Sequence, residues 1–300
     1  MSARFIIVSA INEYYLPLMA DLLRSLLNCK TSFSFDIGVL DVGLTENNRQ
    51  KMISYGVTLR SPGVDIDYPG RKQWEQTAPY FRAMTSRPSL PKYFPGYDAY
   101  LWMDADTWVQ RVEAVEIMLA AAARHPIFFG TSEDDLAYQS SLNDNTRYDM
   151  YRTCFNEQIS ETMRYRPMLS AGFFAMSAQA PHWNVWHNVL SEQLGSLSEV
   201  TQKNFMMEQL CLNLAVYQNK LNIQFMPADY HWITSALMPA YDETTQLFVL
   251  PNPPHRPISV LHLSGSVKNT SQSIRTLDGR VLQQPLTYST WHTERQKRSV

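Results

Sequence analysis

Strand-like and helix-like segments alternate along the first 60 residues, and this alternation limits the possible folds more than any other feature. Three short apolar runs, at residues 4–10, 35–43 and 57–59, are typical of strands buried on both faces. Between them, residues 15–27 carry apolar side chains at helical spacing, and residues 45–56 run from a capping threonine to a terminating glycine. This β-α-β-α-β succession predicts an α/β fold with a parallel sheet covered by helices.

The composition is that of a globular protein. The chain has 300 residues, 45% of them hydrophobic, which is enough for one sizeable domain or two closely joined ones. A formal net charge of −2 argues against a nucleic-acid partner, which normally requires a strongly basic face. The three cysteines lie far apart, which favours reduced thiols and a cytoplasmic location. No window approaches the roughly 20 apolar residues of a membrane span, so we expect a soluble protein.

Two aspartates follow a fourth apolar run, AYLWM at residues 99–103, which we expect to be another strand. Ligands of open α/β sheets bind at the carboxyl ends of the strands, and Asp104 and Asp106 fall at such an end. Carboxylate oxygens suit Mg²⁺ or Mn²⁺, with phosphate oxygens and one further protein ligand completing the shell. The alternative is a turn in which Asp106 caps the helix expected over residues 112–123.

A second informative stretch, SVLHLSGSVKN, lies at residues 259–269. His262 falls near the end of a strand-like segment, Gly265 permits close approach of a phosphate to the backbone, and Lys268 offers a point charge for a pyrophosphate. These residues can join one metal-diphosphate site if His262 meets the two aspartates in space. The alternative is a core histidine beside a surface turn.

Seven segments resemble glycosyltransferase family 8, the retaining GT-A enzymes that include bacterial lipooligosaccharide galactosyltransferases and glycogenin-like proteins. In order, they read VSAINEYYLP, VLDVGLTENNRQKM, APYFR, YLWMDADTWV, LSAGFFAMS, EQLCLNLAVY and HLSGSVK. The resemblance implies a Rossmann-like GT-A domain over residues 1–270, with a mixed, mostly parallel central sheet flanked by helices. Its nucleotide-binding half would span about 1–110 and its acceptor and catalytic half about 111–270, followed by a C-terminal extension, 271–300.

The resemblance also implies roles for individual residues. Asp104, Asp106 and His262 would ligate Mn²⁺ or Mg²⁺, and Gln209 would lie under the anomeric carbon with Glu208 beside it. The diphosphate would be held by Lys268 and the backbone of Gly265. Uracil and ribose would be surrounded by Ser9, Ala10, Asn12 and Tyr14. Further contacts with the donor would come from Tyr80, Arg82, Ala105, Asp134, Ser170 and Ala171. For Asp134, the register relative to its neighbours Glu133 and Asp135 stays open.

The implied reaction is metal-dependent transfer of a hexose from a UDP-sugar, UDP-glucose or UDP-galactose, to an acceptor hydroxyl with retention of configuration. The acceptor could be a carbohydrate, a lipid-linked molecule or a protein, and front-face attack and double displacement both remain open. Some positions depart from the family: Ile11 or Asn12 replaces an acidic residue on uracil, Ser170 an asparagine, Glu208 an aspartate, and residues 269–270 a Pro-Trp pair.

Two alternative functions remain: a non-catalytic nucleotide-sugar-binding protein, and a sugar-1-phosphate nucleotidyltransferase. The second normally has a glycine-rich basic loop after its first strand, where this chain reads SAINEYYLP. Elsewhere, the aromatic residues at 181–190 and the pair Met206 and Met207 favour core packing over an acceptor site. The basic segment 291–300 is typical of a solvated tail, with contact at an anionic membrane surface as the alternative.

Overall fold

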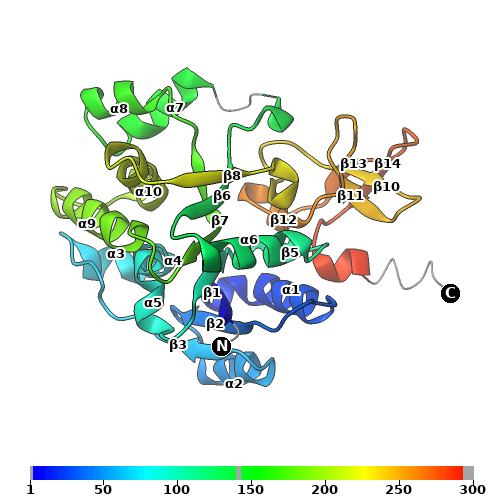
Figure 1. Cartoon of the computed structure of the whole chain (residues 1–300), viewed down its shortest axis with the longest axis horizontal. Coiled ribbons are helices and arrows are strands. Elements are labelled where there is room, and N and C mark those ends of the chain that lie inside the picture. The colour runs from blue at the N-terminus through cyan, green and yellow to red at the C-terminus, as the bar shows by residue number, and fades with distance from the viewer. Residues whose placement is uncertain (1–2, 140–142, 293–300) are drawn as a thin grey trace.

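A computed structural model describes residues 3–139 and 143–292, built around a seven-stranded mixed sheet (Figure 1). The strand order is β3-β2-β1-β4-β7-β6-β8, and β7 alone among these runs antiparallel to both of its neighbours. The strands are β1 Phe5–Ile11, β2 Asp36–Asp41, β3 Thr58–Arg60, β4 Ala99–Met103, β6 Phe128–Ser132, β7 Leu169–Ser177 and β8 Ile223–Met226. The predicted α/β class and the four apolar strands preceding the aspartates are confirmed.

Helices cover both faces of this sheet, because alternate side chains along each strand point to opposite faces. Ile6 and Trp102 join a core cluster with residues of α9 and α10, whereas Ile7 and Leu101 join a second cluster with residues of α1 and α6. The helices are α1 Leu16–Leu27, α2 Glu46–Ser54, α3 Arg71–Thr77, α4 Tyr80–Ser86, α5 Leu90–Tyr93, α6 Glu113–Arg124, α7 Asp144–Arg152, α8 Glu157–Met163, α9 His182–Gly195 and α10 Met207–Gln218.

The aromatic segment at 181–190 belongs to the core, as expected. Trp183 and Trp186 of α9 are both buried, and Met207 at the start of α10 is fully buried. Met206 is half-buried and packs against the same core cluster, as expected, and it also lines a pocket. No helix within the described residues is long and apolar enough to span a membrane.

A small second sheet brings the segments that contain Asp106 and His262 side by side. β5 (Thr107–Val109) pairs antiparallel with β12 (Val260–His262), which pairs parallel with β9 (Trp232–Ile233). Because β5 follows Asp106 directly and α6 begins at Glu113, seven residues after Asp106, the alternative in which Asp106 caps that helix is wrong. The register places His262 opposite Thr107, one residue from Asp106.

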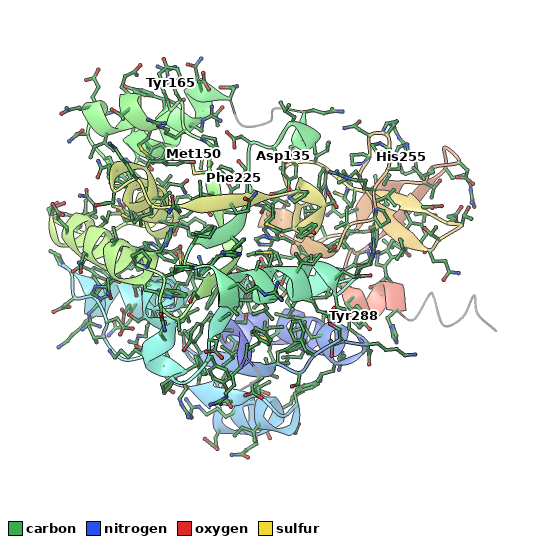
Figure 2. The ribbon with its side chains drawn as sticks, viewed as in Figure 1. Asp135, Met150, Tyr165, Phe225, His255 and Tyr288 are labelled. Atoms are coloured by element: carbon green, nitrogen blue, oxygen red, sulfur yellow. The ribbon has the colours of Figure 1, made fainter. Side chains whose placement is uncertain are left out.

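The C-terminal segment packs against the body of the molecule. Two further hairpins, β10 (Ala240–Asp242) with β11 (Leu247–Val249) and β13 (Gln272–Arg275) with β14 (Val281–Gln284), precede it. Tyr288, labelled in Figure 2, lies where this segment meets the end of α1, and its hydroxyl accepts a hydrogen bond from Asn28 Nδ2 (2.8 Å). Trp291 is buried, so the predicted solvated tail is wrong at its first residue; residues 293–300 of that tail lie outside the described part of the chain.

Candidate active site

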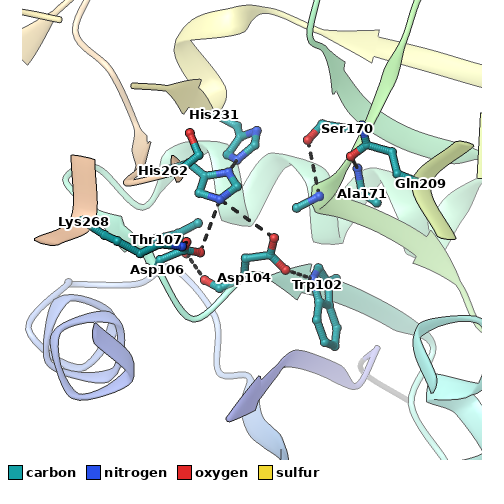
Figure 3. A network of polar contacts seen from close by, with 12 residues as sticks. Trp102, Asp104, Asp106, Thr107, Ser170, Ala171, Gln209, His231, His262 and Lys268 are labelled. Carbon is teal, nitrogen blue, oxygen red and sulfur yellow. Dashed lines mark hydrogen bonds and ion pairs between the residues drawn. The ribbon is translucent and has the colours of Figure 1, made fainter. Parts of the chain in front are cut away.

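A pocket of about 340 Å³ opens at the carboxyl ends of β1 and β4. Asp104, Asp106 and His262 meet in it (Figure 3), with one potential ligand atom from each lying within 4.8 Å of the other two. His262 Nε2 lies 3.3 Å from Asp106 Oδ1 and 3.9 Å from Asp104 Oδ2. The pairing of β12 with β5 explains this approach, and it is supported by a hydrogen bond from Leu263 N to Asp106 O (2.8 Å). His262 is therefore no isolated core histidine.

Each of the two carboxylates is anchored to a cation through one oxygen and turns the other toward the imidazole. Asp104 Oδ1 accepts hydrogen bonds from Arg87 Nη2 (2.5 Å) and Trp102 Nε1 (2.8 Å). Asp106 Oδ2 accepts one from Lys268 Nζ (2.7 Å). Three atoms that could ligate a metal ion then face one another: Asp104 Oδ2, Asp106 Oδ1 and His262 Nε2. Two carboxylate oxygens and one imidazole nitrogen fit a divalent cation of the Mn²⁺ or Mg²⁺ type.

Gly172 on β7 provides the room for this arrangement. A Cβ atom at Gly172 would lie 2.8 Å from His262 Cε1 and 3.0 Å from Asp104 Oδ2, closer than non-bonded carbon atoms normally approach. The Gly172 carbonyl also accepts a hydrogen bond from Asp104 N (2.9 Å), which fixes the turn after β4. The absence of a side chain at this position lets the imidazole and the carboxylate share one small space.

The charges in this cluster reinforce one another. Burial alone would raise the pKa of Asp106, but the neighbouring His262 and Lys268 hold it well below the ordinary value. Burial alone would lower the pKa of Lys268 and of His262, and Asp106 reverses both shifts, so that each pKa is raised. The cluster therefore keeps a charged carboxylate and ammonium in a largely buried setting.

The wall formed by β6, β7 and α10 carries a different set of groups. Gln209 Oε1 accepts a hydrogen bond from Ala171 N (3.0 Å), and Gln209 Nε2 donates one to Glu133 Oε1 (3.0 Å). Glu208 is fully buried and accepts a hydrogen bond from Arg87 Nη1 (2.7 Å). Burial raises the pKa of Glu133 to about 7, against the hydrogen bond from Gln209, and raises that of Glu208 to about 8, against the opposing charge of Arg87.

The other residues predicted to bind the donor divide into two sets. On the pocket wall lie Ala10, Asn12, Tyr80, Ala105, Ser170, Gly265 and Lys268, together with the two candidate catalytic residues Glu208 and Gln209. Ser9 and Ala171 are buried next to lining residues. The structure places Tyr14, Arg82 and Asp134 elsewhere: Tyr14 is 62% exposed on the surface, Arg82 pairs with Glu75, and Asp134 pairs with Arg147.

Tyr15, Arg87 and Glu133 line the pocket as well. Tyr15 lines the pocket, and its hydroxyl accepts a hydrogen bond from Lys268 Nζ (3.0 Å). Glu133 lines the pocket and Asp134 does not, which resolves the register that the sequence left open; a register shift between Gly130 and Ser132 precedes them in β6. The arginine at the pocket is Arg87, which sequence reasoning missed. Arg87 is the only charged residue in the stretch 83–91, and this is the sequence signal that could have identified it.

Comparisons with known proteins identify a family and a fold. The family model described as Glycosyl transferase family 8 matches residues 6–269. Among solved structures, the chain is similar to the galactosyltransferase LgtC in complex with donor and acceptor sugar analogs (TM-score 0.53, 14% identity, 87% of this chain and 88% of that chain). It is also similar to an active-site mutant of LgtC (0.53, 15%, 87% and 87%) and to the apo WbbM bifunctional glycosyltransferase (0.56, 13%, 90% and 48%). No curated protein matches the chain.

Proposed function

The chain belongs to glycosyl transferase family 8 and is a glycosyltransferase with a GT-A fold, and we propose that it transfers a hexose from a UDP-sugar to an acceptor hydroxyl with retention of configuration. The observation that carries the proposal is the convergence of Asp104, Asp106 and His262 beside Lys268 in one pocket. UDP-glucose and UDP-galactose are the proposed donors.

Asp104, Asp106 and His262 would hold Mn²⁺ or Mg²⁺ through the three atoms that face one another. When bound, such an ion supplies positive charge that stabilises the departing diphosphate. Lys268 adds a second positive charge to the same group, and it is already held in place by Asp106 and by the Tyr15 hydroxyl. Gly265 has a positive φ of 63°, so its backbone can approach a phosphate with no side chain intervening. Positive charge held in place before the reaction stabilises the negative charge that develops on the diphosphate, which is electrostatic catalysis.

The hydrogen bonds of Gln209 and Glu208 support front-face attack over double displacement. Gln209 Oε1, the atom that would attack as a nucleophile, already accepts the Ala171 N–H, and Glu208 is fully buried against Arg87. In the front-face route, the acceptor oxygen bonds to the anomeric carbon while the bond to the diphosphate breaks on the same side. The electron pair leaves with the diphosphate, and a phosphate oxygen takes the acceptor proton. Gln209 would then act as a fixed dipole beneath the sugar.

The acceptor is proposed to be a carbohydrate, either free or carried on a lipid or a protein. The similarity to LgtC, whose structure contains donor and acceptor sugar analogs, supports this choice. Tyr80 and Phe205 form an edge-to-face pair at the pocket, with ring centroids 5.9 Å apart, and Phe205 is 42% exposed.

The three cysteines lie within the described residues as free thiols, which supports a cytoplasmic location.

Calorimetry of UDP binding tests the proposed donor and metal. UDP should bind in the presence of Mn²⁺ and lose most of its affinity in excess chelator. NMR of the reaction with UDP-glucose or UDP-galactose should then show an α-configured product. Equal UDP affinity with and without chelator would contradict the metal site. A protein that binds UDP-sugars but neither transfers nor hydrolyses them would be the non-catalytic alternative, and pyrophosphate release from UTP and a sugar 1-phosphate would indicate the nucleotidyltransferase.

A further inference from the structure

A second histidine lies behind His262, on the side away from the carboxylates (Figure 3). His231 Nε2 is 3.0 Å from His262 Nδ1, and His231 Nδ1 is 3.0 Å from Thr131 Oγ1. Thr131 belongs to β6, so the three groups form a continuous chain from the central sheet to the pocket. His231 and Thr131 are fully buried, and His262 is 9% exposed.

The surroundings hold the His231 ring in one orientation. Its ring stacks on Phe173, with centroids 5.2 Å apart and planes inclined by 20°. Its backbone carbonyl accepts a hydrogen bond from the Tyr138 hydroxyl (3.1 Å), and its backbone N–H donates to Ala228 O (3.1 Å). A fully buried ring with this packing cannot rotate away from His262 without opening the core.

The direction of the hydrogen bonds follows from the use of His262 Nε2. If Nε2 binds a cation as a lone-pair donor, the proton of the neutral imidazole must reside on Nδ1. His262 Nδ1–H then donates to His231 Nε2, so His231 carries its own proton on Nδ1 and donates it to Thr131 Oγ1. In the opposite arrangement, His231 Nε2–H would donate to His262 Nδ1 and leave the proton of His262 on Nε2, where it blocks a cation.

We propose that His231 is a positioning residue that fixes the tautomer and the orientation of His262 for cation binding. This inference rests on the proposed function, since it requires His262 to be a metal ligand. Hydrogen bonds to the second nitrogen of a metal-bound histidine typically account for 10- to 100-fold in metal affinity. In proteins such acceptors are usually carboxylates, backbone carbonyls or water, whereas here the acceptor is a second imidazole held by a threonine.

Three variants separate the hydrogen bond from the packing of the ring. His231→Phe keeps an aromatic ring on Phe173 but removes the acceptor, His231→Gln restores an acceptor oxygen, and Thr131→Val removes the next link of the chain.

His182→Phe is the matched control, because His182 is a buried histidine on α9 whose ring lies near Phe128. His262→Ala reports on the metal site itself. The readout is Mn²⁺ affinity, measured from the electron paramagnetic resonance signal of free Mn²⁺, with thermal unfolding in chelator as the check on folding.

His231→Phe should bind Mn²⁺ about 10- to 100-fold more weakly than the wild type, His231→Gln should recover most of the loss, and His182→Phe should leave the affinity unchanged. Thr131→Val should show a smaller loss, and it provides the test if His231→Phe does not fold. The proposal is overturned if His231→Phe binds as tightly as the wild type, or if the Phe and Gln variants lose affinity equally. If His262→Ala also binds Mn²⁺ like the wild type, the metal site of the proposed function fails as well.

Discussion

Two groups of carboxyl side chains line the same pocket under opposite electrostatic conditions. After β4, Asp106 lies beside His262 and Lys268, which hold its pKa well below the ordinary value although burial acts in the other direction. On the wall formed by β6 and α10, burial raises the pKa of Glu133 to about 7 and that of Glu208 to about 8. The Asp106 carboxylate therefore stays charged at neutral pH, while Glu133 and Glu208 take up protons there.

This difference indicates a division of labour within the pocket. A carboxylate that stays charged is suited to hold a cation against a diphosphate, whereas carboxyl groups that take up protons near neutral pH are suited to contact the hydroxyl groups of a sugar. Arg87 connects the two sides, because it donates hydrogen bonds to both Asp104 and Glu208. Its guanidinium also lies over the Trp102 ring, 4.7 Å from the centroid. Substitutions on either side, and of Arg87 itself, test the comparison.

Removal of Arg87 should have the largest effect, and the effect should depend on pH. The raised pKa of Glu208 means that its contribution to stability is full below pH 4.5 and declines as pH rises through about 8. Arg87→Ala leaves Glu208 without its cation, so the free energy of unfolding should fall by about 3–5 kcal/mol at pH 9 and by less at pH 5. Urea unfolding at the two pH values measures this difference.

Arg82→Ala is the control for Arg87, because Arg82 is partly exposed and pairs with Glu75 outside the pocket. It should lower the free energy of unfolding by no more than about 1 kcal/mol at either pH. A pH-independent loss in Arg87→Ala, or equal losses in both variants, would contradict the account of Glu208.

Substitution of the charged side should abolish most of the cation-dependent binding. Asp106→Ala and His262→Ala should each weaken Mn²⁺-dependent UDP binding about 100-fold or more, because truncating one partner of a buried charge pair costs about 2–5 kcal/mol. The double variant should lose less than the sum of the two, since both residues serve one site. Calorimetry measures all three affinities, and fully additive losses would show that the two residues act separately.

Substitution of Gln209, on the wall formed by β6, β7 and α10, should affect turnover more than binding. Gln209→Ala removes a dipole that we place beneath the anomeric carbon, and kcat should fall about 100-fold, as for other single electrostatic groups. The Kd of the donor should change by no more than about threefold, because the interaction strengthens mainly in the transition state. Steady-state kinetics with calorimetry separates the two quantities, and equal losses in both would make Gln209 a binding contact only.

The smallest effect is expected from Gly172→Ala. The added Cβ would push His262 Cε1 or Asp104 Oδ2 aside by a few tenths of an ångström, so Mn²⁺ affinity should fall about 10-fold while the fold persists. Gly63→Ala is the matched control, because a Cβ there meets open space. Unchanged Mn²⁺ affinity in Gly172→Ala would show that the cluster tolerates a looser geometry than the structure indicates.

The sequence predicted the parts of the site that follow directly from regular strands. The apolar run before Asp104 and the strand before His262 placed both residues at strand ends, and the structure brings them together although Asp106 and His262 are 156 positions apart in the sequence. Tyr15 could not be distinguished from Tyr14, because both belong to a short 3-10 helix whose rotation depends on its packing.

Three other residues depend on details of the fold that one sequence does not reveal. The sequence left the register of Glu133 and Asp134 open, and Glu133 is the one that lines the pocket; a single sequence does not reveal an irregularity such as the register shift that precedes them in β6. Arg87 comes from a region of short helices, where tertiary contacts with Trp102, Asp104 and Glu208 aim the side chain. His231 was likewise not predicted, because its partners Thr131 and His262 come from distant strands.

The most direct test of the central claim is an anomalous difference map from crystals grown with Mn²⁺ and UDP. The account predicts one strong manganese peak within coordination distance of Asp104 Oδ2, Asp106 Oδ1 and His262 Nε2, with the UDP diphosphate beside Lys268. A manganese peak that His262 does not reach, or UDP bound in the pocket with no manganese among these three residues, would contradict it.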